Sequence, residues 1–360
     1  MKEIFVKSNS PKIKVIDLFC GIGGLTHGLI KEGLDVIAGI DNDKSCKFGY
    51  EYNNKRAKFI NKDILQVSAD EINQLFGDKE KTIRVLAGCA PCQPFSKLNL
   101  NEITEKQLEP LGKFAQLINE TEPDIVSMEN VSGLADMGKY PIFKIFTDTL
   151  KKNGYNYKYE IVDVSEYGVP QNRKRLVLLA SKLGDIDLVK RTHENKKVTV
   201  RDVIRNLAPI KDGETSQDDP LHRARKLSQK NLQRIKATPH NGGNSSSWHE
   251  DLILKCHKKK SGKTYSSTVY GRMRWDEPAP TMTTQCIGLG NGRFGHPEQD
   301  RAISLREAAL FQTFPKNYQF SEPQNPIFMA HIAKFIGNAV PVRLGVIIGR
   351  SIKTHAEKYG

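Results

Sequence analysis

The stretch Gly88-Cys-Ala-Pro-Cys-Gln-Pro-Phe-Ser96 places one cysteine, Cys92, between two prolines. It directly follows the apolar run 83–87, which predicts a nucleophile on a loop at the carboxyl end of a buried strand. Proline fixes its own φ and restricts the residue before it, so Pro91 and Pro94 stiffen the loop around the sulfur. A cysteine held in this way can attack an electrophilic carbon once it is partly thiolate.

Two other interpretations of Cys92 compete with a nucleophile. Most cysteines are small buried apolar residues, and Cys89-Ala-Pro-Cys92 is also a C-x-x-C, the spacing of redox pairs and of half a zinc site. The chain has six cysteines at irregular positions and no second C-x-x-C. We therefore expect neither a disulfide framework nor a metal site, while the buried and redox alternatives stay open at this point.

Length and composition set broad limits on the answer. The 360 residues suffice for one large domain and a smaller one, and 38% hydrophobic residues can build a core. Residues 1–14 mix Lys, Glu, Asn and Ser, and no run of about 18 apolar residues exists anywhere. We therefore expect a monomeric cytoplasmic protein without signal peptide or membrane span. The net charge of +14 favours a polyanionic partner.

Near the start of the chain, an apolar β-type run at 14–19 leads into Cys20-Gly-Ile-Gly-Gly24 and then into an apolar segment at 25–30. This order predicts strand, glycine turn and helix. Gly21, Gly23 and Gly24 allow a tight turn and close approach of a ligand, at the crevice where doubly wound sheets bind nucleotides. Many such turns contain glycine without a ligand, so this motif alone is weak.

The next two strands each lead to a carboxylate. The strand predicted at 35–40 ends in Asp41, about 20 residues after the glycine turn, where an acidic side chain can accept from ribose hydroxyls. A helix N-cap is the alternative for Asp41. The strand-like run 57–60 leads to Asp63. The two carboxylates suit an adenosyl group. No G-K-[ST] follows the glycines, so we expect a nucleoside without phosphates.

A later strand, predicted at 124–131, carries Glu129 and Asn130 at its end. Parallel strands present their carboxyl ends at one edge, so Glu129 should face the same cleft as Cys92. Partial burial there favours the protonated carboxyl, which can hold or donate a proton. An ordinary strand-end ion pair is the alternative.

Arg173 and Arg175 flank Lys174 just before the apolar strand predicted at 176–180. They point the same way if this segment is extended. Two guanidiniums on one face can donate to a base carbonyl or to phosphate. Charged side chains without a ligand at the start of an ordinary strand would give the same sequence pattern. Helices are predicted at 106–120 and 142–153, with a further strand at 157–164 between them and the arginines.

The stretch from Arg191 to about 276 is dense in basic and small polar residues, and its aromatic residues Trp248, Tyr265, Tyr270 and Trp275 predict a small core with long loops. We assign Lys258, Lys259 and Lys260 to phosphate contacts. Arg272 and Arg274, on a predicted strand, are assigned to guanine, with a structural salt bridge as the alternative. A helical pattern at 328–358 should pack back on the large domain.

Six blocks together resemble, in order and spacing, those of S-adenosylmethionine-dependent DNA (cytosine-5)-methyltransferases of the bacterial restriction-modification type. The resemblance spans nearly the whole chain, and six blocks in one order are far more specific than any single block. They are Asp17-Leu-Phe-Cys-Gly-Ile-Gly-Gly24, Ala90-Pro-Cys-Gln-Pro-Phe-Ser96, Glu129-Asn-Val131, Gln171-Asn-Arg-Lys-Arg175, Pro278-Ala-Pro-Thr281 and Gly337-Asn-Ala-Val-Pro341.

The resemblance implies an α/β fold with a Rossmann-like doubly wound sheet and a smaller inserted target-recognition domain. We expect a catalytic domain at 1–185, the small domain at 190–325 and a returning helical segment at 326–360. It also removes the redox alternative, because Cys92 matches the family's nucleophile while Cys89 stands where the family usually has another residue.

The implied reaction transfers a methyl group from S-adenosylmethionine to C5 of a cytosine flipped out of double-stranded DNA. Cys92 would add to C6, Glu129 would engage N3 and the exocyclic amine, and the two arginines, Arg173 and Arg175, would bind O2. The resemblance also implies a cofactor site and a DNA contact. The cofactor residues are Phe19, Gly21, Gly23, Gly24, Asp41, Asp63, Pro91 and Asn338, and the DNA contact is Ser96.

Two rival functions remain. A relative of the same fold that methylates cytosine in transfer RNA shares the catalytic blocks, but the long basic insert favours DNA. A catalytically dead nucleic-acid-binding module is disfavoured because no catalytic position is substituted. The sequence does not give the recognised bases, and a partner restriction endonuclease stays an open alternative.

Overall fold

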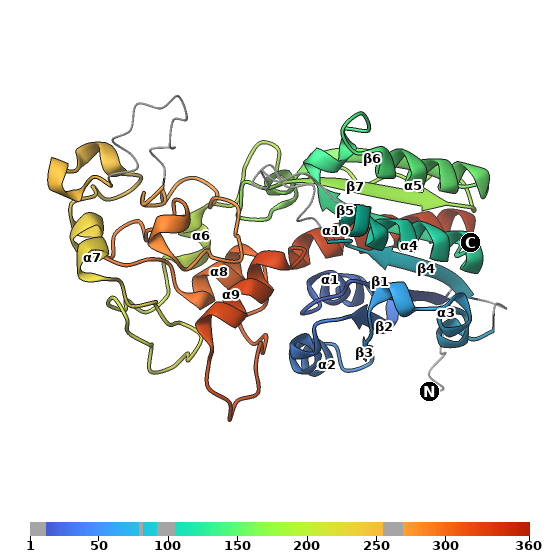
Figure 1. The fold of residues 1–360 in the computed structure, drawn as a ribbon, viewed down its shortest axis with the longest axis horizontal. Coiled ribbons are helices and arrows are strands. Elements are labelled where there is room, and N and C mark those ends of the chain that lie inside the picture. Colours follow the sequence, from blue (N-terminus) through green and yellow to red (C-terminus); the bar gives the residue numbers. More distant parts are fainter. Residues whose placement is uncertain (1–11, 79–81, 92–104, 255–268) are drawn as a thin grey trace, which may run out of the picture. The chain divides into compact units, whose positions relative to one another are not determined.

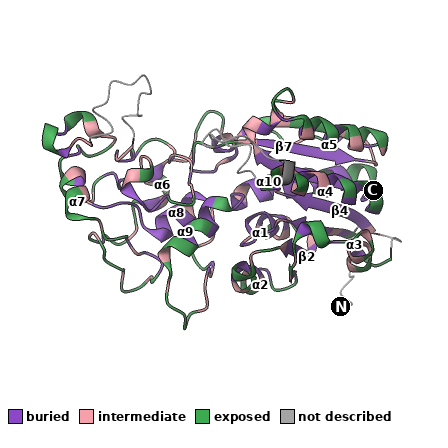
Figure 2. Ribbon diagram, viewed as in Figure 1, coloured by how far each residue is buried: buried purple, intermediate pink, exposed green. Residues whose placement is uncertain are grey.

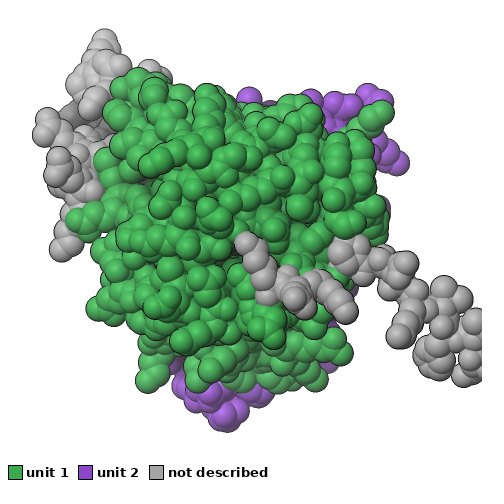
Figure 3. Space-filling view, turned by 90° about the vertical axis from the view of Figure 1, so that its right-hand side faces the viewer, with its two compact units in different colours: residues 1–162, 175–190, 345–360 green, residues 163–174, 191–344 purple. Residues whose placement is uncertain are grey.

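The computed structural model describes residues 12–78, 82–91, 105–254 and 269–360. The chain forms two compact units, coloured separately in Figure 3. Unit 1 comprises residues 1–162, 175–190 and 345–360, and unit 2 comprises residues 163–174 and 191–344. The segments of unit 2 are therefore inserted within the sequence of unit 1.

Unit 1 is built on a seven-stranded sheet with the order β3-β2-β1-β4-β5-β7-β6 (Figure 1). The strands β1 to β5 that pair with one another do so in parallel, whereas β7 is antiparallel to β5. The strands are β1 (Lys12–Leu18), β2 (Asp35–Asp41), β3 (Lys58–Asn61), β4 (Thr82–Gly88), β5 (Ile125–Val131), β6 (Asn156–Asp163) and β7 (Lys174–Ser181).

Helices cover both faces of this sheet, which confirms the doubly wound architecture. Side chains alternate between the faces of a strand. Ile16 and Leu18 of β1 lie in one core cluster with residues of α3 (Ala69–Phe76), α4 (Glu105–Thr121) and α5 (Pro141–Lys152). Asp17 points to the other face, where it accepts a hydrogen bond from Thr26 of α1 (Gly24–Lys31). The central strands are buried between these layers (Figure 2).

The order of the strands reverses at β1, which pairs with β2 on one side and with β4 on the other. In open α/β sheets, ligands bind outside the carboxyl ends of the strands at such a switch point. The segments that leave these ends are the glycine turn after β1 and the Cys89 loop after β4. The fold therefore brings the two candidate motifs to one edge of the sheet.

Unit 2 has little regular structure, but many of its apolar side chains are buried, among them Phe294, Phe311 and Phe314. Its helices are α6 (Val200–Ile204), α7 (Gln229–Lys236), α8 (Leu305–Phe311) and α9 (Met329–Asn338). Trp248 and Tyr270 pack edge to face with ring centroids 5.7 Å apart, and Trp275 is also buried. These aromatic residues thus pack in a core as predicted, but that core is larger than expected, and Tyr265 lies outside the described residues.

Two expected boundaries need correction. Residues 163–174, assigned to the catalytic domain, belong to unit 2, and so does α9, which was expected to return with the C-terminal segment. Only residues 345–360, within α10 (Val342–Tyr359), belong to unit 1, where the Gly345 backbone packs directly on Leu25 of α1. Pro341 separates α9 from α10, because proline cannot continue a helix.

The sequence analysis also missed α2 (Lys47–Asn53) and α3, which are only seven and eight residues long. Among the described residues one stretch, Met329–Tyr359, is long and apolar enough to cross a membrane. However, 83% of its apolar window is buried inside the protein. A core element of a folded protein passes the same test, and we interpret this stretch as part of the core.

A buried ion pair lies at the centre of unit 2. Glu307 accepts hydrogen bonds from Nη1 and Nη2 of Arg301 at 2.8 and 2.7 Å and from the Ser304 amide at 2.7 Å. Burial alone would raise the pKa of the Glu307 carboxyl, but the Arg301 charge and these hydrogen bonds lower it to about 2. Removing one partner of such a pair leaves an uncompensated buried charge.

We therefore predict that Glu307→Gln lowers the free energy of unfolding of unit 2 by about 3–5 kcal/mol. Because the folded pKa lies below the ordinary value of 4.5, this contribution is complete above pH 4.5 and is lost as the pH falls toward 2. Urea unfolding at pH 7 and pH 3 measures both effects. The exposed pair Lys144–Asp148 supplies the control, since Asp148→Asn should change little. Equal losses for the two variants would contradict the prediction.

Candidate active site

The glycine turn after β1 has an unusual backbone. Phe19, Gly21 and Gly23 have positive φ angles of 59°, 50° and 90°. Glycine adopts this region at no steric cost, but a side chain with a Cβ does so only where the surrounding structure enforces it. The half-buried Phe19 ring packs against the main core cluster, which supplies that constraint. Strain of this kind in an enzyme is typical of a binding site.

Asp41 holds the glycine turn in place. Its Oδ2 accepts from the Gly21 amide at 2.9 Å, and its Oδ1 accepts from the Asp43 amide at 2.8 Å. The N-cap at this end of β2 is Asp43, so the helix-cap alternative for Asp41 is wrong. A Cβ built on Gly21 would meet no atom within 4 Å, so there is open space beside the turn. Asp63 is exposed and caps the short turn at 64–66 through the Leu65 amide.

Asp17 is a further candidate site residue, which the sequence analysis did not single out. It lies at the end of β1 with 1% of its surface exposed, and its Oδ2 accepts from Thr26 Oγ1 at 2.6 Å. Its Oδ1 accepts no hydrogen bond from the residues that the structure describes. Burial, with a smaller contribution from the Asp41 charge, raises the pKa of Asp17 to about 7. The signal that could have identified Asp17 is an acidic residue near the end of an apolar strand, shortly before a glycine turn.

The loop after β4 is fixed at its first residues. The Cys89 amide donates to the Leu18 carbonyl at 3.3 Å, and the Ala90 carbonyl accepts from Asn130 Nδ2 at 3.1 Å. Pro91 follows and is exposed. Cys92 and Ser96 lie outside the described residues. The backbone that leads into the Cys92 loop is thus tied to both neighbouring strands of the sheet.

Glu129 is buried at the end of β5, with 2% of its surface exposed. Its Oε2 accepts a hydrogen bond from the Cys89 thiol at 2.7 Å, and Arg175 Nε lies 3.0 Å from its Oε1 in an ion pair. Oε1 itself accepts no aligned hydrogen bond from the described residues. A buried acceptor with unused capacity, beside a guanidinium, is a place for a polar ligand group.

The sequence analysis expected Arg173 and Arg175 to point the same way from one extended segment, and this is not observed. Arg175 lies half-buried beside Glu129 in unit 1, whereas Arg173 belongs to unit 2. Arg173 is buried and donates to the Met282 carbonyl at 3.0 Å. β7 begins at Lys174, after Arg173, so the two arginines do not extend from one strand. Arg175 is therefore the arginine of the pair that accompanies Glu129.

The two arginines expected to contact bases, Arg272 and Arg274, differ in burial and in their contacts. Arg272 is fully buried and donates to the carbonyls of Thr238, Ile235, His296 and Gln299 and to Asp300. Its assignment to guanine is wrong, because a guanidinium occupied in this way cannot reach a base. No strand forms here, and Arg272 makes only an isolated bridge to Gly295. Arg274 is exposed and pairs with Glu277 at 2.8 Å.

The remaining expected residues can be placed only in part. Asn338 is exposed and is the last residue of α9. Gly337 before it lies so close to the backbone of Thr283 and Thr284 that a Cβ would meet atoms at 2.3 Å, which explains the glycine. Lys258, Lys259 and Lys260 lie outside the described residues.

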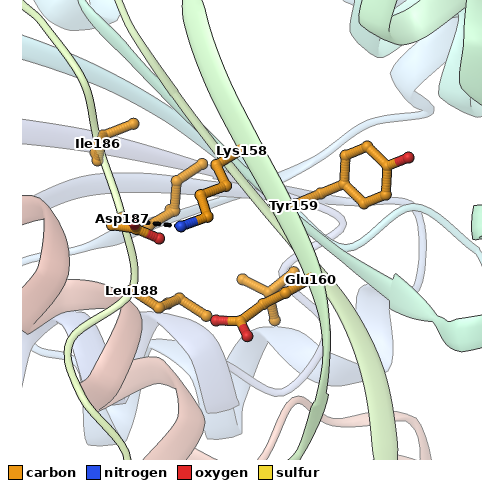
Figure 4. Close-up of a pocket in the computed structure, with 8 residues that line it drawn as sticks. Lys158, Tyr159, Glu160, Ile186, Asp187 and Leu188 are labelled. Carbon is orange, nitrogen blue, oxygen red and sulfur yellow. Dashed lines mark hydrogen bonds and ion pairs between the residues drawn. The ribbon is translucent and has the colours of Figure 1, made fainter.

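Two hollows in unit 1 are separate from these residues. Figure 4 shows the first, where Lys158 of β6 and Asp187 point toward one another. Its volume of about 10 Å³ holds one water at most. The second has a volume of about 580 Å³ and is lined by the starts of β1 and β2, at Lys12 and Asp35. It lies at the opposite edge of the sheet from the glycine turn, and neither hollow contains a predicted site residue.

Among the residues that the structure describes, no group of three His, Cys, Asp or Glu residues could hold a metal ion. Four of the cysteines there form no disulfide: Cys20, Cys46, Cys89 and Cys286. The candidate site combines a strained turn with two carboxylates, and a buried carboxylate paired with a thiol and an arginine.

Comparison with known proteins agrees with this arrangement. Residues 13–354 match the model of the C-5 cytosine-specific DNA methylase family. The chain is 51% identical to the Type II methylase M.HgiDII of Herpetosiphon aurantiacus, over 95% of this chain and 96% of that one. It is 31% identical to the Type II methyltransferase M.Eco47II of Escherichia coli, over 94% of this chain and 78% of that one.

Solved structures show the same fold at low sequence identity. A prophage-encoded DNA modification methyltransferase of E. coli superposes with a TM-score of 0.69 at 21% identity, over 95% of this chain and 99% of that one. DNMT2 of Spodoptera frugiperda gives a TM-score of 0.62 at 17% identity, over 94% and 99%. With a family match over nearly its whole length, this chain belongs to the C-5 cytosine-specific DNA methylases and is a DNA (cytosine-5) methyltransferase.

Proposed function

We propose that this enzyme methylates C5 of a cytosine flipped out of double-stranded DNA, through a covalent bond between Cys92 and C6. The observation that supports this best is Glu129. It is buried, its Oε2 is occupied by Cys89, and its Oε1 has unused hydrogen-bonding capacity beside Arg175. A pyrimidine edge with a ring nitrogen, an exocyclic amine and a carbonyl is the kind of polar group that such a pair can bind.

The turn after β1 fits S-adenosylmethionine, the methyl donor that the family implies. Gly21 leaves open space, Asp41 lies at the turn with its carboxylate, and the partly exposed Phe19 ring offers a face for stacking. Gly23 and Gly24 let α1 start at this point, and Asp63 and Pro91 are further candidates in unit 1. Asn338, in unit 2, is a candidate through the resemblance to the family. When bound, S-adenosylmethionine supplies an electrophilic methyl group.

The protein's own residues would make the cytosine reactive. The Cys92 thiolate adds to C6, and Glu129 gives a proton to N3, so that electron density moves to C5. Arg175 holds the O2 carbonyl and offsets the charge on Glu129. After C5 has taken the methyl group, water accepts the C5 proton as the Cys92 thiolate leaves C6, and N3 returns its proton to Glu129, which restores the neutral aromatic ring. The base must leave the stack for this, because C6 is inaccessible inside a duplex.

Unit 2 would recognise the target sequence. Arg274 is exposed and two residues from the buried Arg272, which fixes the backbone around it. We assign Arg274 to base contacts, and Ser96 and Lys258 to Lys260 to the DNA backbone. The names of the relatives support a role in a type II restriction-modification system, with a partner endonuclease for the same site. A monomer in the cytoplasm suits this role.

A first prediction tests the nucleophile. Cys92→Ala should abolish methyl transfer while S-adenosylmethionine and DNA still bind, because only the covalent step is lost. Duplex DNA with 5-fluorocytosine at the target should trap the wild-type enzyme, since fluorine cannot leave C5 as a proton does. Cys89→Ala should still form this adduct, and Cys92→Ala should not. Turnover by Cys92→Ala, or methylation of transfer RNA in place of duplex DNA, would contradict the proposal.

A second prediction concerns Glu129. Glu129→Gln should lower kcat by on the order of 10² or more, the scale of a positioned acid or base, with the affinity for S-adenosylmethionine unchanged. Single-turnover methylation and equilibrium cofactor binding measure the two quantities. Glu120→Gln removes an exposed carboxylate of unit 1 and should leave both unchanged. Lost cofactor binding with normal turnover at saturation would place Glu129 in the cofactor site instead.

A third prediction separates affinity from specificity. Replacing Lys258, Lys259 and Lys260 by Ala should weaken binding to all DNA and flatten the salt dependence by roughly 0.9 for each phosphate that a lysine no longer neutralises. Arg274→Ala should cost about 1–3 kcal/mol on the target alone. Binding of one target duplex and one single-base variant across a salt series measures both. The assignment is reversed if the lysine variant loses discrimination and Arg274→Ala retains it.

A further inference from the structure

The Cys89 thiol touches the carboxylate that the proposed reaction uses. Its Sγ lies 2.7 Å from Glu129 Oε2, and the thiol donates to that oxygen. The Cys89 side chain thus contacts the buried Glu129 directly.

The contact follows from the pairing of the strands. β4 and β5 run in parallel with Gly88 opposite Met128, so the next residues along, Cys89 and Glu129, emerge side by side. One residue further, Asn130 Nδ2 donates to the Ala90 carbonyl at 3.1 Å and keeps the two chains together beyond the sheet. The thiol is therefore held against the carboxylate by the backbone on both sides.

The two oxygens of Glu129 consequently have different surroundings. Oε2 accepts from Cys89, whereas Oε1 lies 3.0 Å from Arg175 Nε and accepts no aligned hydrogen bond from the described residues. A carboxylate that is held at one oxygen cannot rotate freely. Its other oxygen then points in a fixed direction, which is what a positioned acid requires.

A thiol is a weak hydrogen-bond donor. Its effect on Glu129 is therefore geometric, because the hydrogen bond to Oε2 limits the orientations open to the carboxyl group.

We propose that Cys89 is a positioning residue, which orients Glu129 through the thiol–Oε2 hydrogen bond and so directs Oε1 at the target base. The inference rests on the proposed function of Glu129. It assigns no nucleophilic role to Cys89, which therefore is not required for the covalent step.

Three variants test the proposal by single-turnover methylation across pH. Cys89→Ala should lower kcat on the order of tenfold, because the carboxyl loses its orientation, with KM for S-adenosylmethionine unchanged. Cys89→Ser keeps a donor to Oε2, so it should recover most of the wild-type rate. Cys286→Ala removes a buried thiol of unit 2 and serves as the control.

A double-mutant cycle distinguishes positioning from a general structural role. If Cys89 acts through Glu129, Cys89→Ala should cost nothing further in the Glu129→Gln background, whereas a structural defect would cost the same in both. The inference is overturned if the two effects add, or if Cys89→Ser behaves like Cys89→Ala at every pH. Methyl transfer by the wild-type enzyme and its trapping on 5-fluorocytosine DNA are measured first. If neither occurs, the proposed function itself is contradicted. If both occur and the effects of Cys89→Ala and Glu129→Gln add, only this inference is contradicted.

Discussion

The parallel register of β4 against β5 determines the geometry of the proposed reaction centre. Backbone hydrogen bonds place Gly88 opposite Met128, and from this alignment the chain delivers the start of the Cys92 loop beside Glu129. A shift by one residue would turn every side chain of the strand to the other face of the sheet. The apolar side chains of β4 and β5 are buried on both faces, which makes such a shift very costly. Core packing thus fixes the position of Glu129 relative to the end of β4.

The glycine turn after β1 follows a different principle, in which local strain is balanced by polar contacts. Phe19 carries a Cβ in a backbone conformation that favours glycine, and the buried Asp17 has a carboxylate oxygen without a described partner. Both features destabilise the free enzyme. The Asp41 hydrogen bond to Gly21 and the packing of the Phe19 ring on the core hold the turn against this cost.

Much of unit 1 could be predicted from the sequence, because its strands are short, apolar and bounded by glycine or acidic residues. The predicted strands and the helices α4 and α5 agree with the structure to within one or two residues, whereas the helical segment predicted at 328–358 is divided into α9 and α10. Unit 2 was harder, since its backbone is organised by buried side chains that hydrogen-bond to carbonyls. Alternation between Tyr270 and Trp275 suggested a strand with exposed arginines, but Arg272 is buried by contacts from segments distant in sequence. Likewise, no local pattern could show that Cys89 meets Glu129, 40 residues away.

The burial of Arg272 has a consequence for how the small unit can change over time. Its guanidinium joins the end of α7 to the loops at 238 and 296–300, so any replacement there would leave several carbonyls without donors. Arg274, two residues along, is exposed and makes one surface ion pair, and exchanges at such positions typically alter stability very little. Substitutions can therefore accumulate at the exposed position 274, while the buried Arg272 maintains the backbone conformation around it.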